Sequence, residues 1–318
     1  MILVLNVGSS SLKYARFDGE REVARDEVDI AGDYAAAVAH ALDGDAPSAV
    51  GHRVVHGGPT LLAPARIDAT VISTLELAVP FAPLHLPPAI AAIRAVRAHL
   101  PDVPQVAAFD TYFHRDLPEV ARRYALPLPD GVHRYGFHGL SYEYLATKIS
   151  VPRAVFAHLG SGASLAAVRD GRPIDTTMGL TPTGGIVMAT RPGDLDPGLL
   201  VYLLDHGHDA RSLEKLVNHD GGLRALCGDT DMRKILTRTD DAARLAVDAF
   251  CYSVRKAIGA YAAALGGLDA VVFTGGIGAH SSEIRDRVVQ PLAFLGAQVH
   301  AIGTDEERIV ARHTLATL

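Results

Sequence analysis

The segment Val4-Leu5-Asn6-Val7-Gly8-Ser9 begins a pattern that the chain uses twice. An apolar run leads into a turn of small residues, a second apolar run follows, and Asp18-Gly19 ends the pattern. Ala157-His158-Leu159-Gly160-Ser161 begins the same pattern about half a chain later, and Asp170-Gly171 ends it at the same spacing. Self-similarity at this scale indicates a duplicated domain in which a strand–turn–strand hairpin begins each half. Two unrelated hairpins that share glycines are the alternative.

Apolar runs and helical periodicity alternate along the rest of the chain, which is the pattern of an α/β protein. The expected strands cover residues 2–5, 12–17, 105–109, 154–157 and 270–273. The expected helices cover residues 89–100, 242–265 and 283–292. Ser281-Ser282 and Thr304-Asp305 each precede Glu residues, a combination that predicts the start of a helix.

The composition is that of a globular protein and excludes several classes of function. The 318 residues are 48% hydrophobic, which excludes a disordered chain. The formal net charge is −6, whereas proteins that bind nucleic acid or anionic membranes carry a basic excess. The apolar stretch at residues 257–268 is too short to span a bilayer.

The N-terminus and the cysteines bear on the compartment. Residues 1–11 lack the basic leader and long apolar core of a signal peptide. Cys227 and Cys251 are the two cysteines of the chain, too few for a disulfide framework. We therefore expect a cytoplasmic protein whose partners are small molecules rather than nucleic acids or membranes.

Three turns rich in Gly and Ser, at residues 8–11, 160–162 and 275–278, follow expected strands. Such turns can place several main-chain N–H groups around an anion. The third turn also precedes an expected helix, whose N-terminus favours negative charge. None has the G-x-x-x-x-G-K-[ST] spelling of a P-loop, which disfavours a Walker-type ATPase. One such turn is more often a tight connection, but three of them predict a nucleotide cleft between two domains.

Four polar side chains lie within apolar segments or between turn residues. Arg53 lies inside the strand-like segment GHRVVHGG (residues 51–58), where a buried Arg needs an anionic partner. Asp110 follows an expected strand, at the edge where ligands of such sheets bind. His138 and Arg191 lie between turn residues. Judged alone, Arg53 could form a structural ion pair, Asp110 could cap a helix, and His138 could be a hydrogen-bonded core residue.

The motifs taken together resemble those of the acetate kinases, within the family of acetate, propionate and butyrate kinases. The resemblance covers essentially the whole chain and is highly specific. It rests on the strings LNVGSSSLKY, GHRVVHGG, APLHLPPA, FDTYFH, RYGFHGLSYEYLA, HLGSGASLAAV, IDTTMGLTPTGG, TRPGDLDPG, DTDMRKI, VFTGGIGAHSSEIR and TDEERIVAR. It implies a duplicated actin-like (ribonuclease H-like) ATPase fold with two lobes and a nucleotide cleft between them. We expect the lobes to be residues 1–150 and 151–318, with the last helix packing back on the N-terminal lobe.

The resemblance implies ATP and Mg²⁺, with Mn²⁺ as an alternative metal, and reversible transfer of the γ-phosphoryl group of ATP to acetate. Asn6 and Glu306 would help to hold the metal, and Asp110 would position the metal or act on the substrate carboxylate. Arg53 would grip that carboxylate, and Arg191 with His138 would stabilise the phosphoryl group in transfer. The remaining carried-over residues are Lys13 at the phosphates and His85 in support; Val55, Leu84, Phe137 and Pro182 in an apolar pocket; and His158, Leu159, Gly160, Ser161, Gly162, Asp231, Met232, Arg233, Gly276, Ile277, Gly278, Ala279 and His280 at the nucleotide.

The chemistry of phosphoryl transfer supports this set of two Arg residues, one His and Mg²⁺. Phosphoryl transfer passes through a loose in-line transition state with charge on the equatorial oxygens, so catalysis is mostly positioning and stabilisation by cations. A carboxylate is already a nucleophile at pH 7 and needs no strong base. The guanidinium fork of Arg suits the planar carboxylate, and Mg²⁺ typically keeps few protein ligands and several waters.

Several positions depart from the family pattern. Ser161 replaces the usual Asn of the HLGNG string, and Ala279-His280 replaces the usual Glu-Asn at the nucleotide side. Leu86 stands in place of Asn, Leu140-Ser141-Tyr142 in place of Thr-Ser-His, and Asp305 in place of Asn. The chain is also short for the family, most of all between Lys13 and Arg53.

Three other functions stay open from the sequence. Propionate or butyrate could replace acetate, because one methylene is worth only about 1–3 kcal/mol of discrimination. GTP or pyrophosphate could replace ATP, since the departures cluster at the nucleotide side. A non-catalytic actin-like module that binds nucleotide is the third, although it has no need for all the charged residues together. The family also implies a homodimer formed largely through the C-terminal half.

Overall fold

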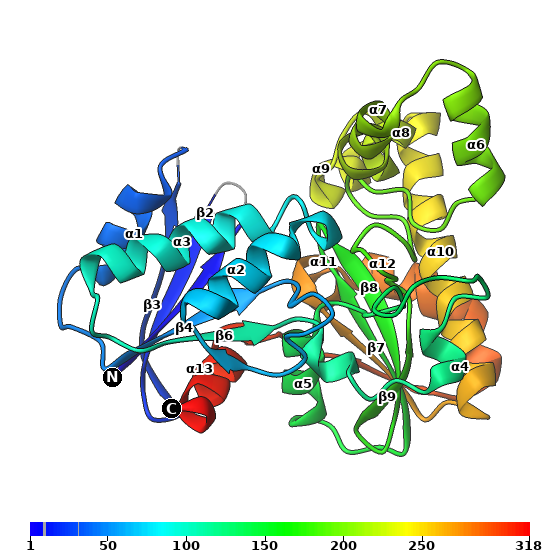
Figure 1. The fold of residues 1–318 in the computed structure, drawn as a ribbon. Coiled ribbons are helices and arrows are strands. Elements are labelled where there is room, and N and C mark those ends of the chain that lie inside the picture. The colour runs from blue at the N-terminus through cyan, green and yellow to red at the C-terminus, as the bar shows by residue number, and fades with distance from the viewer. Residues whose placement is uncertain (9–10, 31) are drawn as a thin grey trace.

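The computed structural model describes residues 1–8, 11–30 and 32–318. Ser9 and Ser10, which belong to the first predicted glycine turn, lie outside the described residues. The described chain forms two sheets, each with its own covering helices (Figure 1). Residues 2–109 supply the strands of the first sheet, and residues 153–301 supply those of the second.

The first sheet has the order β3-β2-β1-β4-β6-β5. The hairpin β1–β2 and the pair β2–β3 are antiparallel, whereas β4 is parallel to β1 and β6 is parallel to β4. Its strands are β1 (Ile2–Val7), β2 (Ser11–Asp18), β3 (Arg21–Asp29), β4 (Ala49–Val54), β5 (Ala65–Arg66) and β6 (Gln105–Phe109).

The second sheet repeats this plan, in the order β9-β8-β7-β10-β11. The pairs β7–β8 and β8–β9 are antiparallel, and β10 and β11 continue the sheet in parallel. The second strand of each hairpin, β2 or β8, also shifts register against the next strand, at Arg16/Phe17 and at Ala167/Val168. The strands are β7 (Arg153–Leu159), β8 (Ala163–Arg169), β9 (Arg172–Thr176), β10 (Ala270–Thr274) and β11 (Gln298–Ala301). The duplication expected from the twin hairpins is therefore confirmed, and so is the actin-like fold that the resemblance implies.

Helices cover the sheets on both sides (Figure 1). Those of the first half are α1 (Tyr34–Leu42), α2 (Ala69–Leu77), α3 (Leu86–His99), α4 (Glu119–Arg122) and α5 (Gly139–Ala146). Those of the second are α6 (Pro197–Asp205), α7 (Ala210–Lys215), α8 (Gly222–Cys227), α9 (Met232–Thr237), α10 (Asp241–Leu265), α11 (Gly275–His280), α12 (Ser282–Val289) and α13 (Glu306–Thr317). In Figure 1, α6 to α9 form a small helical group at one end of the long helix α10.

The last helix, α13, lies on the first sheet although it follows the second in sequence (Figure 1). Ile309, Val310 and Ala311 pack in one apolar cluster with Ile2 and Val4 of β1. The approach is so close that a Cβ at Gly51 of β4 would overlap the Thr314 hydroxyl. This placement brings the first turn of α13 to the polar end of β1.

Two sequence expectations need correction. Residues 275–278 are not a turn ahead of a helix, because they already form the first residues of α11. The helix expected over residues 283–292 ends at Val289, where a 3₁₀ segment (Gln290–Leu295) with a Pro near its start follows. The predicted helix starts at Ser281 and Asp305 are confirmed, since both side chains accept hydrogen bonds from the first turn.

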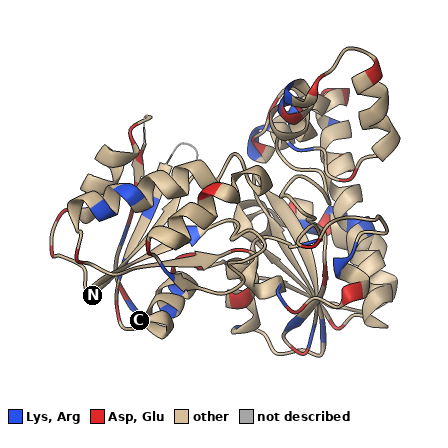
Figure 2. Cartoon of the chain, in the orientation of Figure 1, with Lys and Arg blue, Asp and Glu red and all other residues tan. Residues whose placement is uncertain are grey.

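Charges of both signs are distributed over both halves (Figure 2). Among the described residues, the longest helix is too polar to be read as a membrane span, and the others are too short or too polar.

Candidate active site

The centre of the candidate site is an ion pair between two neighbouring parallel strands. Arg53 lies near the end of β4, and Asp110 follows the last residue of β6, where its N–H donates to the Val54 carbonyl. The Arg53 guanidinium donates to both carboxylate oxygens of Asp110, with Nε–Oδ1 at 3.0 Å and Nη2–Oδ2 at 2.7 Å. Asp110 is buried, so this bidentate pair is largely shielded from water.

The predicted metal ligands Asn6 and Glu306 meet at the same guanidinium. Arg53 Nη1 donates to Asn6 Oδ1 at 3.1 Å, and Arg53 Nε lies 3.3 Å from Glu306 Oε2. Glu306 is buried, and burial together with the nearby acidic groups Asp110 and Glu307 raises its pKa to about 7 despite Arg53. This carboxyl group is therefore short of positive charge.

The side-chain oxygens of Asn6, Asp110 and Glu306 are of the type that binds a hard cation such as Mg²⁺. Within the described ranges no cluster of three His, Cys, Asp or Glu residues is arranged to hold a metal. Two carboxylates and one amide oxygen do converge, however, and Mg²⁺ needs few protein ligands beside its waters. Lys13, beside Asn6 in the β1–β2 register, contributes positive charge that lowers the Glu306 pKa.

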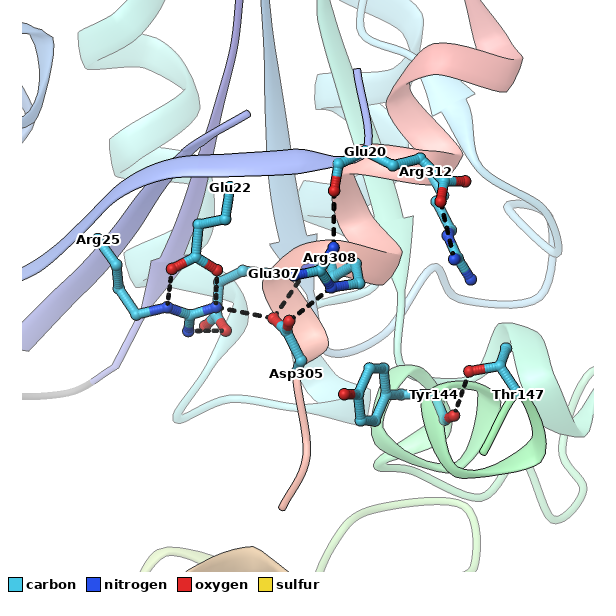
Figure 3. A network of polar contacts seen from close by, with 9 residues as sticks. All are labelled: Glu20, Glu22, Arg25, Tyr144, Thr147, Asp305, Glu307, Arg308 and Arg312. Carbon is cyan, nitrogen blue, oxygen red and sulfur yellow. Dashed lines mark hydrogen bonds and ion pairs between the residues drawn. The ribbon is translucent and has the colours of Figure 1, made fainter. Parts of the chain in front are cut away.

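A network of polar contacts joins β3 to the start of α13, next to Glu306 (Figure 3). Arg25 of β3 forms ion pairs with Asp305 and Glu307, at 2.7 and 2.8 Å, on either side of Glu306. The other oxygen of Glu307 accepts from Asn6 Nδ2 at 2.8 Å, which turns Asn6 Oδ1 toward Arg53. Sequence reasoning misses Arg25 and Glu307, because Glu307 fits the pattern of a helix start and nothing in the polar strand β3 marks Arg25.

Two histidines stack beside this centre. The rings of His138 and His158 lie 4.1 Å apart at an interplanar angle of 7°. Their Nδ1 atoms contact serine hydroxyls at 2.9 Å, His138 that of Ser164 and His158 that of Ser141. Burial lowers both pKa values, that of His158 to about 3, and the nearby Arg53 adds to the effect. Both rings are thus neutral at pH 7.

Arg191 approaches the same place from the second half of the chain. A Cβ at Gly162 would lie 2.7 Å from Arg191 Nη2 and 3.4 Å from His138 Nε2, so both groups border that glycine. Burial lowers the Arg191 pKa to about 10, and no carboxylate of the described residues forms an ion pair with it. Its Nη1 donates to the Pro182 carbonyl instead. Burial and the charges of Arg191 and Arg53 lower the pKa of His85 to about 3.

The Gly160 turn and the glycine-rich start of α11 come together next to these groups. A Cβ at Gly160 would lie 4.0 Å from the N atom of Gly276, and one at Gly276 would meet open space. Leu159 and Met232 are buried in the core, so their side chains are not available to contact a nucleotide. Asp231 caps α9 and pairs with Arg233 at 2.8 Å, whereas Ser161 and His280 are exposed.

The residues predicted to form an apolar pocket are present but mostly engaged in the core. Val55 and Phe137 belong to the largest apolar cluster, Pro182 is buried, and Leu84 is half-buried. Two hollows of about 500 and 720 Å³ lie elsewhere, one between α2 and α3 and one beside α7. Neither contains a predicted catalytic residue.

Comparison with known proteins shows the family to which the chain belongs. The model of the acetokinase family matches residues 40–315. An acetate kinase of Rhizobium meliloti is 42% identical over 387 aligned residues, which cover 100% of this chain and 98% of that protein. One of Nitrobacter hamburgensis is 45% identical over 86% of this chain and 76% of that protein.

Solved structures show the same likeness. An acetate kinase of Porphyromonas gingivalis superposes with a TM-score of 0.85 at 32% identity, covering 99% of this chain and 98% of the other. A propionate kinase of Francisella tularensis gives a TM-score of 0.88 at 31% identity, covering 100% and 99%. The chain belongs to the acetokinase family.

Proposed function

We propose that this protein transfers the γ-phosphoryl group of ATP reversibly to acetate, giving acetyl phosphate and ADP. A carboxylate oxygen of acetate forms a bond to the γ-phosphorus as the bond to the β–γ bridging oxygen breaks, and ADP leaves with that electron pair. The observation that carries the proposal is Arg191, a half-buried residue beside a glycine turn and His138 that has no carboxylate partner among the described residues. Such a charge calls for an anion, and a phosphoryl group in transfer supplies one.

The first half of the chain would hold the acid and the metal. Asp110 already occupies Nε and Nη2 of Arg53, so the acid would contact this guanidinium through its remaining N–H groups. Asn6, Asp110 and Glu306 would hold Mg²⁺ or Mn²⁺. When bound, the metal would neutralise the phosphate charge that develops during transfer.

The second half would hold the nucleotide. The Gly160 turn, the start of α11 at Gly276 and the start of α9 at Asp231 would surround it. Lys13 would approach its phosphates from the first half. His85 would support Arg191 and Arg53. Ser161, Ala279 and His280, which differ from the family pattern, make the phosphoryl donor worth testing with GTP and pyrophosphate.

Propionate is the second candidate acid, because a propionate kinase matches this fold as well as the acetate kinases do. The comparison of kcat/KM on acetate, propionate and butyrate decides between them, since the expected difference per methylene is only about 1–3 kcal/mol. Acetate should give the highest value; equal or higher values on the longer acids would overturn the acetate assignment.

The decisive variant is Arg191→Ala, assayed by trapping acetyl phosphate with hydroxylamine. We expect kcat to fall by about 10³-fold, because the charge that stabilises the transferring group is lost, with nucleotide affinity nearly unchanged. Arg172→Ala, at an exposed position of β9, is the matched control and should retain wild-type turnover. Wild-type protein that turns over no short acid with any donor would favour the non-catalytic module.

We further propose a cytoplasmic homodimer with the lobe division at residues 150/151. The division lies in the link between α5 and β7. Cys227 and Cys251 are free, which fits a reducing compartment. Helix α6 has no buried residue although most of its side chains are apolar, and a second subunit would cover it.

A further inference from the structure

Three side chains next to the transfer centre form a short chain of hydrogen bonds. Tyr142 of α5 lies one turn after His138, the N-cap residue of that helix, and both side chains contact Ser164 of β8. The Tyr142 hydroxyl lies 2.6 Å from Ser164 Oγ, and His138 Nδ1 lies 2.9 Å from the same atom. Tyr142 and Ser164 are both fully buried, so water does not compete for these contacts.

The chemistry of the three groups sets the direction of the chain. A phenol is a better donor and a poorer acceptor than an alkyl hydroxyl, so Tyr142 donates to Ser164 Oγ. Burial raises the pKa of Tyr142, which keeps its proton in place. Ser164 then has one proton to give, and the acceptor in reach is His138 Nδ1. A neutral imidazole that accepts at Nδ1 carries its proton at Nε2.

The Nε2–H group of His138 lies beside the Arg191 guanidinium. His138 Nε2 and Arg191 Nη2 both border the Cβ position of Gly162, so they are directed to the same space. His138 itself has a left-handed backbone with φ 57°, a conformation uncommon for a residue other than Gly. The tautomer of this ring is therefore set by its Nδ1 partner, Ser164.

We propose that Tyr142 and Ser164 are positioning residues that hold His138 as the Nε2–H tautomer, so that it donates a hydrogen bond to the phosphoryl group in transfer. The inference rests on the proposed kinase function for its catalytic consequence. Without the tyrosine proton, Ser164 is free to accept from Nδ1–H, and the ring can present a bare nitrogen to an anion. The tautomer is thus a property that a purely structural role for Tyr142 would leave unchanged.

The test is Tyr142→Phe, which removes one hydroxyl and keeps the ring that packs in the core. The ring protons of ¹⁵N-histidine-labelled protein are observed by long-range ¹H–¹⁵N NMR at pH 7.5, with the His138 signals assigned by their loss in His138→Gln. We expect Nε2–H in the wild type and a mixture with Nδ1–H in the variant. The kcat should fall about 3- to 10-fold with both KM values within about twofold, since one hydrogen bond to the reacting group is weakened.

Two controls lie in the chain itself. His158 makes the corresponding contact with Ser141 and should keep its tautomer in Tyr142→Phe. Tyr144→Phe on the same helix removes a hydroxyl that is not part of this chain of hydrogen bonds, from a ring beside Lys148. It should change neither the His138 tautomer nor kcat.

A double-mutant cycle tests whether Tyr142 and Ser164 act through one chain of hydrogen bonds or independently of each other. Ser164→Ala removes the group through which Tyr142 acts, so Tyr142→Phe should cost nothing further in the Ser164→Ala background. Additive losses of kcat, or an unchanged His138 tautomer in Tyr142→Phe, would overturn the proposal. The NMR result does not require turnover, so a wild type without kinase activity would refute the proposed function while the tautomer still tests the chain of hydrogen bonds.

Discussion

His52 is a buried histidine of β4 whose proton content makes stability depend on pH. Its Nε2 lies 2.8 Å from Gln105 Oε1, to which the neutral ring donates, and burial lowers its pKa to about 4 against this hydrogen bond. An unfolded chain binds the proton near pH 6.5, whereas the folded chain does not until pH 4. Stability is therefore full above pH 6.5 and is lost as pH falls toward 4, by about 3 kcal/mol for this one group.

The prediction is that His52→Gln flattens this dependence. Urea unfolding at pH 7.5, 6 and 5 should show a smaller loss of unfolding free energy in His52→Gln than in the wild type. His56 and His114 are buried, with pKa values also lowered to about 4, so part of the loss remains in the variant. His99→Gln, at an exposed position of α3, should leave the dependence as it is. Parallel pH curves for His52→Gln and wild type would contradict the argument.

At the scale of elements, the contact between β3 and α13 lies beside the proposed metal site at Asn6 and Glu306 (Figure 3). Arg25→Gln removes the cation that faces Asp305 and Glu307 on either side of Glu306. We expect the half-saturating Mg²⁺ concentration to rise about threefold or more, because Glu307 then repels Glu306 and holds Asn6 less firmly. The Arg25 side chain is 40% exposed, so unfolding free energy should fall by only about 1 kcal/mol.

A matched variant tests whether any α13 ion pair would do. Arg312→Gln breaks a pair between the same helix and Glu20, away from Glu306. It should change thermal stability as little as Arg25→Gln does and leave the Mg²⁺ dependence at the wild-type value. Equal Mg²⁺ curves for both variants would show that the β3 contact is merely structural.

The elements that could be predicted from the sequence are those whose own residues report burial. Strands β1, β6 and β10 are continuous apolar runs bounded by turn residues, and α10 carries a clear apolar stripe. Helices α6 and α7 contain no buried residue, so no stripe could reveal them. The start of α11 reads as a turn because three of its first four residues are Gly.

The residues of the candidate site likewise fall into those that the sequence predicts and those that it does not. Arg53, Asp110, His138 and Arg191 stand out because a charged or titratable residue in an apolar segment needs a reason, and the structure brings them together. Arg25 and Ser164 lie in ordinary strand sequence, and what makes them important is a partner far along the chain. Such contacts depend on how α13 and α5 dock, which local patterns do not encode.

The whole molecule is shorter than its relatives without losing the repeated core. The Rhizobium meliloti alignment extends over 387 residues, against the 318 of this chain, yet both sheets keep their shared order. That the shortening falls mainly between Lys13 and Arg53 stays a prediction. The proposed transfer site draws on both halves, because Arg53 and His138 come from the first half and Arg191 from the second.

The proposed dimer follows from the exposed surface of the second half. In α6, Val201 and Tyr202 are 58% and 56% exposed, and the helix is too short to be stable without packing. A charge at its centre should therefore be costly only if a second subunit covers it. We expect light scattering to give a dimer for the wild type and a monomer for Val201→Glu at micromolar concentration, while Leu77→Glu, at an exposed position of α2, stays dimeric. A Val201→Glu protein that remains dimeric, with unchanged circular dichroism, would place the interface elsewhere on the molecule.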